Sequence, residues 1–251
     1  ADTIGEQGAL YLNGDDPLLQ QLRESYTGKI VWYGMESDCD YQAVNIDTVK
    51  GCTRFELHAP FGAHKIMIPA LGLHNVSNAL AAIAVAYDQG LTLDDIRCGL
   101  LTYEGLAMRQ QIHELDKITV IDDSYNASPD SIKSGIGVLM AVKSTGKKIA
   151  VLADMLELGE RSAQAHLELG AYAAASGVDA VVTVGREAEK IAEGAAEESR
   201  KILVKACGTN DEAFAELEKI LNDGDCVLVK GSRGMHTLSL IHITLPTKRI
   251  V

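Results

Sequence analysis

Short apolar runs alternate with longer stretches of helical periodicity from Met108 onward, and this alternation restricts the fold more than any other feature. The runs predicted as strands are residues 117–121, 148–152, 180–184, 202–204 and 226–229. The stretches predicted as helices are residues 129–142, 162–176, 188–198 and 210–221. Strands that alternate with helices form a mostly parallel sheet with helices on its faces. This part of the chain is therefore predicted to be an α/β, Rossmann-like domain.

The first part of the chain follows a different pattern. Strands are expected at residues 9–12 and 29–34, with a helix from Pro17 through Leu22 between them. Three strand-like segments, 41–49, 53–58 and 64–68, are separated by glycine and proline, which favours an antiparallel meander. Helices are expected at residues 71–90 and 91–101, the second capped by Thr92. Residues 103–107 resemble a linker, so we predict two domains, 1–105 and 106–251.

A polar loop follows the strand predicted at residues 117–121 and reads IDDSYNASPD. Ser128 and Pro129 are typical of a helix start, which needs no function. That explanation leaves Asp122, Asp123 and the neighbouring Tyr125 and Asn126 unexplained. Adjacent carboxylates repel each other, and the carboxyl end of a parallel strand is where α/β proteins bind ligands. We therefore expect these side chains to serve a ligand or a cation.

A second polar cluster opens the helix predicted at residues 71–90, in the run LGLHNVSNALAA. Asn75 and Asn78 are three residues apart and so lie on one side of a helix, with His74 beside them. Their amides could read the edge of a purine or bind exposed backbone. Asn75 could instead be a simple helix cap, but that explanation does not cover Asn78, because asparagine is a poor residue inside a helix.

Composition excludes several classes of protein. A net charge of -12 and a pI near 5.0 argue against a nucleic-acid groove or a polybasic membrane surface. No apolar run approaches the roughly 20 residues of a membrane span, and no secretory signal pattern is present. The five cysteines form no C-x-x-C pair, which indicates neither zinc nor a disulfide framework and fits a reducing cytoplasm. There is no G-x-G-x-x-G after a first strand and no G-x-x-x-x-G-K-[ST], so neither a dinucleotide site nor a self-contained phosphate loop is expected.

Six runs occur in a fixed order: NGDDP, LGLHNVSNALAA, AMRQQ, IDDSYNASPD, LADMLELGERSAQAH and VLVKGSRG. In this order the chain resembles the Mur ligases of peptidoglycan synthesis over about residues 9–234, and the SYNASPDS and DMLELG runs are similar to the MurF-type branch. The resemblance implies an α/β fold. Residues 1–105 would be the C-terminal part of a central ATP-binding domain, and residues 106–251 a Rossmann-like C-terminal ligase domain.

The resemblance also implies an activity. Such ligases are ATP-dependent and use Mg²⁺: the carboxylate of a UDP-N-acetylmuramoyl-tripeptide becomes an acyl phosphate, which the amine of D-alanyl-D-alanine attacks. The cysteine usage and the charge described above add a cytoplasmic location and no nucleic-acid partner, and we expect a monomer. The phosphate loop and the metal ligands of the family would precede residue 1. The chain is therefore expected to be a fragment that is inactive alone, and no metal-binding residue is predicted within it.

Site residues follow from the same resemblance. Asn75 and Asn78 match positions that contact adenine, and His74 lies in the same motif. Arg109 matches an arginine that reaches the ATP phosphates, although Gly-Leu-Ala-Met precedes it here where the family commonly has Pro-Gly. Asp123 matches the acid that binds the ribose hydroxyls.

The remaining candidates lie at predicted strand ends on one rim of the sheet. Tyr125 and Asn126 occupy the loop where sister ligases place groups near the reacting phosphate. The dipeptide is expected to bind beside them, with its carboxylate on a basic residue and its ammonium on an acidic one. For each charge the alternative is a surface ion pair worth under about 1 kcal/mol. The substrate candidates are Asp154, Glu157, Lys230, Ser232 and Arg233.

Two alternatives for the function stay open. Another Mur ligase or a folylpolyglutamate synthase would share the nucleotide residues but differ at the SYNASPDS and DMLELG runs. A non-catalytic module that binds an adenine nucleotide is also compatible with the absence of a phosphate loop. His166 is expected to have a packing or capping role. The tail 236–251 is β-branched and contains Pro246, so we expect it to be non-native or poorly packed.

Overall fold

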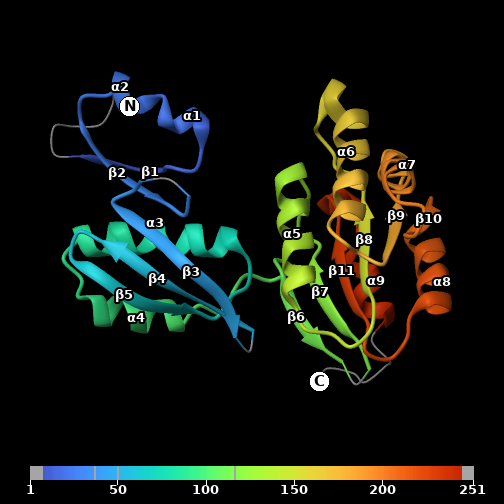
Figure 1. The fold of residues 1–251 in the computed structure, drawn as a ribbon. Coiled ribbons are helices and arrows are strands. Elements are labelled where there is room, and N and C mark those ends of the chain that lie inside the picture. The colour runs from blue at the N-terminus through green and yellow to red at the C-terminus, as the bar shows by residue number, and fades with distance from the viewer. Residues whose placement is uncertain (1–7, 37, 50, 116, 245–251) are drawn as a thin grey trace. The chain divides into compact units, whose positions relative to one another are not determined.

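The computed structural model describes residues 8–36, 38–49, 51–115 and 117–244. It divides into two compact units, Ala1–Glu104 and Gly105–Val251, which are considered separately below (Figure 1). No helix among the described residues is long and apolar enough to cross a membrane.

The first unit is built on a five-stranded sheet in the order β1-β2-β3-β4-β5. β1 and β2 are parallel, as are β2 and β3, whereas β3, β4 and β5 form the expected antiparallel meander. The strands are β1 (Ala9–Asn13), β2 (Lys29–Gly34), β3 (Tyr41–Val49), β4 (Cys52–Ala59) and β5 (Gly62–Ile68).

Two longer helices, α3 (Leu73–Asp88) and α4 (Leu93–Leu101), pack their apolar sides into the core of this unit. Leu80 and Ile83 of α3 are fully buried there. α4 begins at the predicted cap, where the Thr92 hydroxyl accepts a hydrogen bond from the Asp95 amide. The single helix expected after Pro17 is instead two short helices, α1 (Pro17–Gln20) and α2 (Leu22–Ser25).

The second unit contains a six-stranded sheet in the order β10-β9-β8-β11-β7-β6. Every neighbouring pair is parallel except β6 and β7. The predicted α/β, Rossmann-like architecture is therefore confirmed. The strands are β6 (Gln111–Glu114), β7 (Thr119–Asp123), β8 (Lys148–Ala153), β9 (Ala180–Val184), β10 (Leu203–Cys207) and β11 (Cys226–Lys230).

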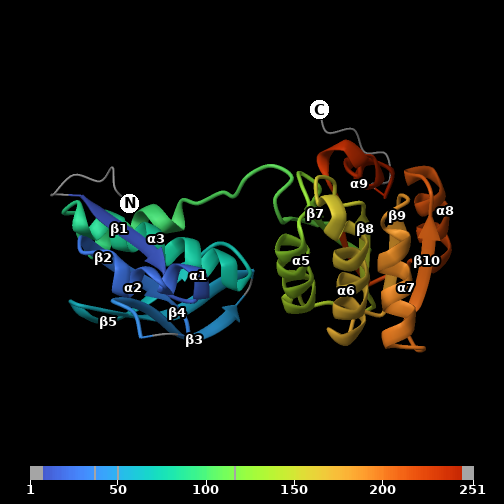
Figure 2. The ribbon, with the colours of Figure 1, turned by 90° about the horizontal axis from the view of Figure 1, so that it is seen from above.

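Helices cover both faces of this sheet. In Figure 2, α5 (Pro129–Ala141), α6 (Ser162–Ala175) and α7 (Glu189–Glu198) lie side by side along the sheet. α8 (Asn210–Ile220) and α9 (Leu238–Thr244) pack against the other face, where Leu217 and Leu240 join the core formed by alternate residues of the strands. Two single-turn helices, η1 (Gly159–Arg161) and η2 (Arg233–Met235), follow β8 and β11.

The tail differs from the sequence-based expectation. Thr237 and Leu240 are fully buried and Ile241 is 4% exposed, so the expected poor packing is wrong for these residues. Residues 245–251 of the predicted tail lie outside the described residues. β6 was not predicted either, because its four residues include no β-branched run.

The register of the sheet determines which loops meet. β11 lies between β7 and β8, and Lys230 is the neighbour of both Asp123 and Leu152. The loops that follow β7, β11 and β8 therefore all lie at the carboxyl ends of these parallel strands, where α/β proteins bind their ligands.

Candidate functional site

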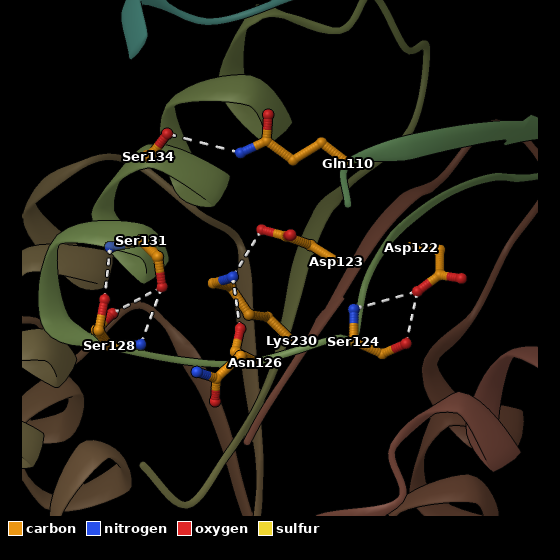
Figure 3. Close-up of polar contacts among 9 residues, drawn as sticks. All are labelled: Gln110, Asp122, Asp123, Ser124, Asn126, Ser128, Ser131, Ser134 and Lys230. Carbon is orange, nitrogen blue, oxygen red and sulfur yellow. Dashed lines mark hydrogen bonds and ion pairs between the residues drawn. The ribbon is translucent and has the colours of Figure 1, made fainter. Parts of the chain in front are cut away.

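The two neighbouring acids at the end of β7 point away from each other, as successive side chains of a strand do (Figure 3). Asp122 accepts hydrogen bonds at Oδ1 from the amide of Ser124 (3.1 Å) and from its hydroxyl (2.6 Å). Its buried carboxylate therefore stabilises the turn after β7. These hydrogen bonds account for Asp122 without a ligand.

Asp123 forms an ion pair with Lys230, and both side chains are almost completely buried. Lys230 Nζ lies 2.7 Å from Asp123 Oδ2 and donates a second hydrogen bond, of 3.0 Å, to the backbone oxygen of Asn126. Burial raises the pKa of Asp123 and lowers the pKa of Lys230, while the attraction between the two charges opposes both shifts. A Cβ at Gly135 of α5 would lie 3.3 Å from Asp123 Oδ2 and 3.4 Å from Lys230 Cδ, so glycine there makes room for the pair.

This arrangement places Lys230 beneath the loop rather than in contact with solvent. It binds the β7–α5 loop from β11 and holds the backbone of Asn126 in position. Lys230 is thus placed as a support of the loop, and its predicted contact with a dipeptide carboxylate stays a prediction.

A pocket of about 440 Å³ opens above this loop, at the carboxyl ends of β7, β8 and β11. It brings together five predicted site residues, from three segments far apart in the sequence. These are Tyr125, Asn126, Glu157, Ser232 and Arg233. The other lining residues are Ala127, Ser128, Leu156, Leu158 and Gly234.

Sequence reasoning assigned no role to Leu156 or Gly234. Leu156 is 46% exposed and lies in the loop that follows β8. The available signal in the sequence was a leucine shortly after a strand, in a polar loop where it need not be buried. A Cβ at Gly234 would lie 3.0 Å from Leu156 Cδ1, so the two residues contact each other across the pocket wall. The pocket consequently combines one carboxylate and one guanidinium with apolar side chains.

Tyr125 lies near two arginines of the same unit. Cζ of Arg109 is 4.5 Å from the centre of the tyrosine ring, and Cζ of Arg233 is 5.8 Å from it. Attraction between a cation and the ring face holds such pairs together. Two guanidinium groups close to one ring create a positive region beside the pocket, which suits a carboxylate or phosphate.

Ser232 and Asp154 have internal partners. The Ser232 hydroxyl accepts a hydrogen bond from the Leu156 amide (2.9 Å). The Ser232 backbone amide donates to the backbone oxygen of Asp154 (3.1 Å). The Asp154 carboxylate accepts from the Ala188 amide (2.7 Å) and does not line the pocket. Of the two acids predicted to bind an ammonium group, the pocket therefore contains Glu157 and not Asp154.

A second pocket, of about 260 Å³, lies in the first unit and contains both predicted adenine-binding amides. The Asn75 side chain donates to the Leu71 backbone oxygen (2.8 Å), and α3 begins after Gly72, so Asn75 is not the cap of the helix. Asn78 is exposed, whereas His74 does not line this pocket. The lining residues are Ile68, Ala70, Asn75, Asn78, Ala79, Ala82, Gly99, Leu100 and Tyr103.

The two pockets differ in what they can hold. Apolar walls with two amide groups fit a flat heteroaromatic base, which needs stacking area and a few hydrogen bonds. Within the part of the chain that the structure describes, no group of three or more histidine, cysteine, aspartate or glutamate side chains is placed to hold a metal ion.

Comparison with known families agrees with the motifs. The Mur ligase middle domain matches residues 2–86, and the Mur ligase glutamate ligase domain matches residues 108–233. The chain belongs to the Mur ligase family. The predicted order in this Mur ligase chain, middle-domain sequence followed by a C-terminal ligase domain, is thereby confirmed.

Several curated relatives of this Mur ligase are named UDP-N-acetylmuramoyl-tripeptide–D-alanyl-D-alanine ligase. The protein of Bacillus subtilis is 35% identical over 233 residues, which cover 92% of this chain and 50% of that protein. The protein of Escherichia coli is 32% identical over 191 residues, which cover 75% of this chain and 42% of that protein. The chain spans about half the length of the curated relatives it matches.

Solved structures of MurF proteins are also similar to this chain. MurF of Acinetobacter baumannii superposes with a TM-score of 0.86 at 31% identity, covering 96% of this chain and 52% of that one. MurF of Thermotoga maritima, solved in complex with ADP, has a TM-score of 0.80 at 26% identity and covers 95% of this chain and 53% of that one.

Proposed function

We propose that this chain is part of an ATP-dependent ligase that joins D-alanyl-D-alanine to UDP-N-acetylmuramoyl-tripeptide through an acyl phosphate. The names of the relatives support this activity. The observation that carries the proposal is the pocket at the strand ends, which combines Glu157 and Arg233 with Leu156 and Leu158. A dipeptide zwitterion with two small apolar side chains has the complementary chemistry.

Arg233 is proposed to bind the dipeptide carboxylate, because a guanidinium can donate two parallel hydrogen bonds to it. Glu157 is proposed to bind the ammonium and to orient the nitrogen, which must lose one proton to become a neutral amine before it attacks the acyl phosphate. Arg109 and Tyr125 are proposed to lie near the phosphate that leaves, where positive charge stabilises it.

The nucleotide half of the proposal rests on the pocket of the first unit. Asn75 and Asn78 are proposed to bind the adenine of ATP, with His74 in the same motif. Asp123 is proposed to bind the ribose hydroxyls, which requires the carboxylate oxygen that is not paired with Lys230. Mg²⁺ would accompany ATP in such a reaction, and no group of three or more histidine, cysteine, aspartate or glutamate side chains among the described residues is placed to hold it.

A cytoplasmic location and a monomeric state complete the proposal. Gel filtration with light scattering tests the monomer directly.

Calorimetric titration of the whole chain with D-alanyl-D-alanine tests the dipeptide site. Arg233→Met and Glu157→Gln should each weaken binding by about 10- to 100-fold, since each removes a charge-assisted hydrogen bond. Glu160→Gln is the matched control, because Glu160 is exposed and does not line the pocket. L-alanyl-L-alanine and D-alanine should bind more weakly than D-alanyl-D-alanine. Equal affinity for all three ligands, or no binding at millimolar concentration, would count against the site.

Titration with ADP tests the nucleotide site. Asn78→Ala should weaken binding by about 5- to 100-fold through the loss of an amide contact. Ser77→Ala, one position along α3 and outside the pocket, is the control. Unchanged ADP affinity in the Asn78 variant would contradict the adenine assignment.

The complete reaction needs a phosphate-binding loop, and residues 1–251 contain no G-x-x-x-x-G-K-[ST] sequence. We therefore expect the chain alone to release no phosphate from ATP with both substrates and Mg²⁺ present. A chimera that places residues 8–234 in the matching half of the Bacillus subtilis ligase should form the amide bond with the dipeptide. A chimera that accepts single amino acids would support another Mur ligase or a folylpolyglutamate synthase. ADP binding by the chain, combined with an inactive but folded chimera, would favour a non-catalytic nucleotide-binding module.

A further inference from the structure

The loop Met155–Leu158 forms one wall of the pocket and is held in an uncommon backbone conformation. Glu157 has a φ of 68°. A residue with a Cβ rarely adopts the left-handed region unless its surroundings determine the backbone. Something outside the loop must therefore fix the conformation that turns Glu157 into the pocket.

Two consecutive amides of the loop donate to two buried side chains. The Met155 amide donates to His166 Nε2 at 3.0 Å, and the Leu156 amide donates to Ser232 Oγ at 2.9 Å. His166 lies on α6, is completely buried and does not line the pocket. Ser232 is 2% exposed and follows β11. The loop is thus attached to two different elements by hydrogen bonds made just before its strained residue.

The protonation of the imidazole follows from its partners. Nε2 accepts a hydrogen bond from an amide and so carries no proton, which leaves the proton on Nδ1. Nδ1 donates to the Ser162 backbone oxygen at 2.7 Å. The Ser162 hydroxyl in turn donates to Glu187 at 3.0 Å, which extends the network to the segment before α7. Both ring nitrogens are used, so His166 has no free atom for proton transfer to a ligand.

We propose that His166 and Ser232 are positioning residues that hold the Met155–Leu158 loop in the conformation that presents Leu156 and Glu157 to the dipeptide. The role in dipeptide binding rests on the proposed function, whereas the role in loop conformation does not. A buried imidazole that only filled space would be replaceable by an apolar side chain, but here an apolar side chain would leave a buried amide without an acceptor.

Three variants of the whole chain separate positioning from packing. His166→Leu keeps an apolar volume and removes the acceptor. His166→Gln keeps an amide oxygen near the place of Nε2 and so should rescue the bond. His113→Gln, on edge strand β6, is the matched histidine control.

Amide hydrogen exchange by NMR reads the loop itself. In His166→Leu, exchange of the Met155 amide should accelerate by at least about 10-fold while the amide of Val182 in β9 stays protected, since a lost hydrogen bond exposes the loop amide locally. His166→Gln and His113→Gln should exchange like the original chain. Long-range ¹H–¹⁵N spectra should show the His166 proton on Nδ1. Unchanged Met155 exchange in His166→Leu, or a proton on Nε2, would overturn the proposal.

Titration with D-alanyl-D-alanine reads the consequence for the pocket. His166→Leu and Ser232→Ala should each bind the dipeptide about 10-fold more weakly, and His166→Gln within about 3-fold of the original chain. If the original chain does not bind the dipeptide, the proposed function fails, while the exchange data still decide whether the two residues position the loop. Altered exchange with unaltered dipeptide affinity would refute the link between the loop and the ligand.

Discussion

The Asp123–Lys230 ion pair allows a direct test of stability. Replacing Lys230 by methionine leaves Asp123 buried without its counter-charge and removes a donor from the Asn126 oxygen. We expect a loss of about 3 to 5 kcal/mol in the free energy of unfolding, measured with urea at pH 7. The double variant Lys230→Met with Asp123→Leu should recover most of this loss, because no charge is then buried. A single-variant effect below about 1 kcal/mol would mean that water reaches the carboxylate.

Tyr11 should make stability depend on pH in the alkaline range. Its hydroxyl donates to Asp88, which also binds Lys29, and this hydrogen bond raises the pKa of Tyr11 to about 12. Above pH 10.0, the ordinary pKa of tyrosine, the unfolded chain loses the phenol proton of Tyr11, whereas the folded chain keeps it. The contribution of the Tyr11 hydrogen bond to the free energy of unfolding is therefore complete below pH 10 and is lost as the pH rises toward 12.

The comparison with Tyr11→Phe isolates this effect, since other titrating groups contribute alike to both proteins. The difference in unfolding free energy between the two should be constant up to about pH 10 and then shrink. A difference that grows with pH would mean that the phenol ionises more readily in the folded chain.

Single residues were predictable where their partners are local. Ser128 accepts from Ser131 at the start of α5, and Pro129 occupies the first turn, as the sequence indicates. Lys230 and Asp123 were each singled out, but their pairing was not foreseen, because it joins strands far apart in the chain. The left-handed backbone of Glu157 was likewise hidden, since it is determined by His166 and Ser232 rather than by its neighbours.

Close contact between helices α6 and α7 depends on glycine. A Cβ at Gly194 would lie 2.0 Å from the Leu167 backbone oxygen, so the helices would have to separate. Gly194→Ala should therefore destabilise the chain by about 1 to 3 kcal/mol, as other overpacked sites do. The measurement is urea unfolding followed by far-UV circular dichroism.

Gly137 of α5 is the matched control for that substitution. It is exposed, inside a helix, and nothing lies within 4 Å of the place of its Cβ. Gly137→Ala should stabilise the chain by about 0.5 to 1 kcal/mol, because alanine loses less backbone freedom on folding. Equal effects at the two positions would show that helix propensity, and not helix contact, determines the result.

Elements were predictable where periodicity is long and uninterrupted. β2, β3 and β9 have the predicted bounds. Each of the helices α5 to α8 differs from its predicted bounds by about one residue at one end. α9 was missed because its sequence, LSLIHIT, has the β-branched composition of a strand. Burial of Leu240 and Ile241 against the sheet outweighs that weak local preference. β6 was missed because an edge strand of four residues leaves too short a pattern.

At the scale of the whole chain, the sequence indicates a parallel sheet but not the order of its strands. β11 is the last strand in sequence and lies between β7 and β8. This order brings the SYNASPDS, DMLELG and VKGSRG runs to one pocket. Resemblance to a family places these runs on one rim, whereas periodicity alone could not, because strand order depends on contacts between distant segments.

Each unit has its own hydrophobic core, which predicts that the units unfold as separate cooperative steps. The single tryptophan, Trp32, is buried on β2 and so reports only the first unit. Far-UV circular dichroism reports helices of both units. The transitions followed by tryptophan fluorescence and by circular dichroism should therefore not coincide in urea.

The substitution in the second unit makes this expectation decisive. Gly194→Ala should lower the urea midpoint of one step in circular dichroism and leave the fluorescence midpoint of Trp32 unchanged, because the two residues belong to different cores. Arg233→Met, at the exposed pocket of the same unit, should shift neither midpoint by a measurable amount. If Gly194→Ala moves both midpoints equally, the two units unfold in a single cooperative step, and the expectation of separate steps is wrong.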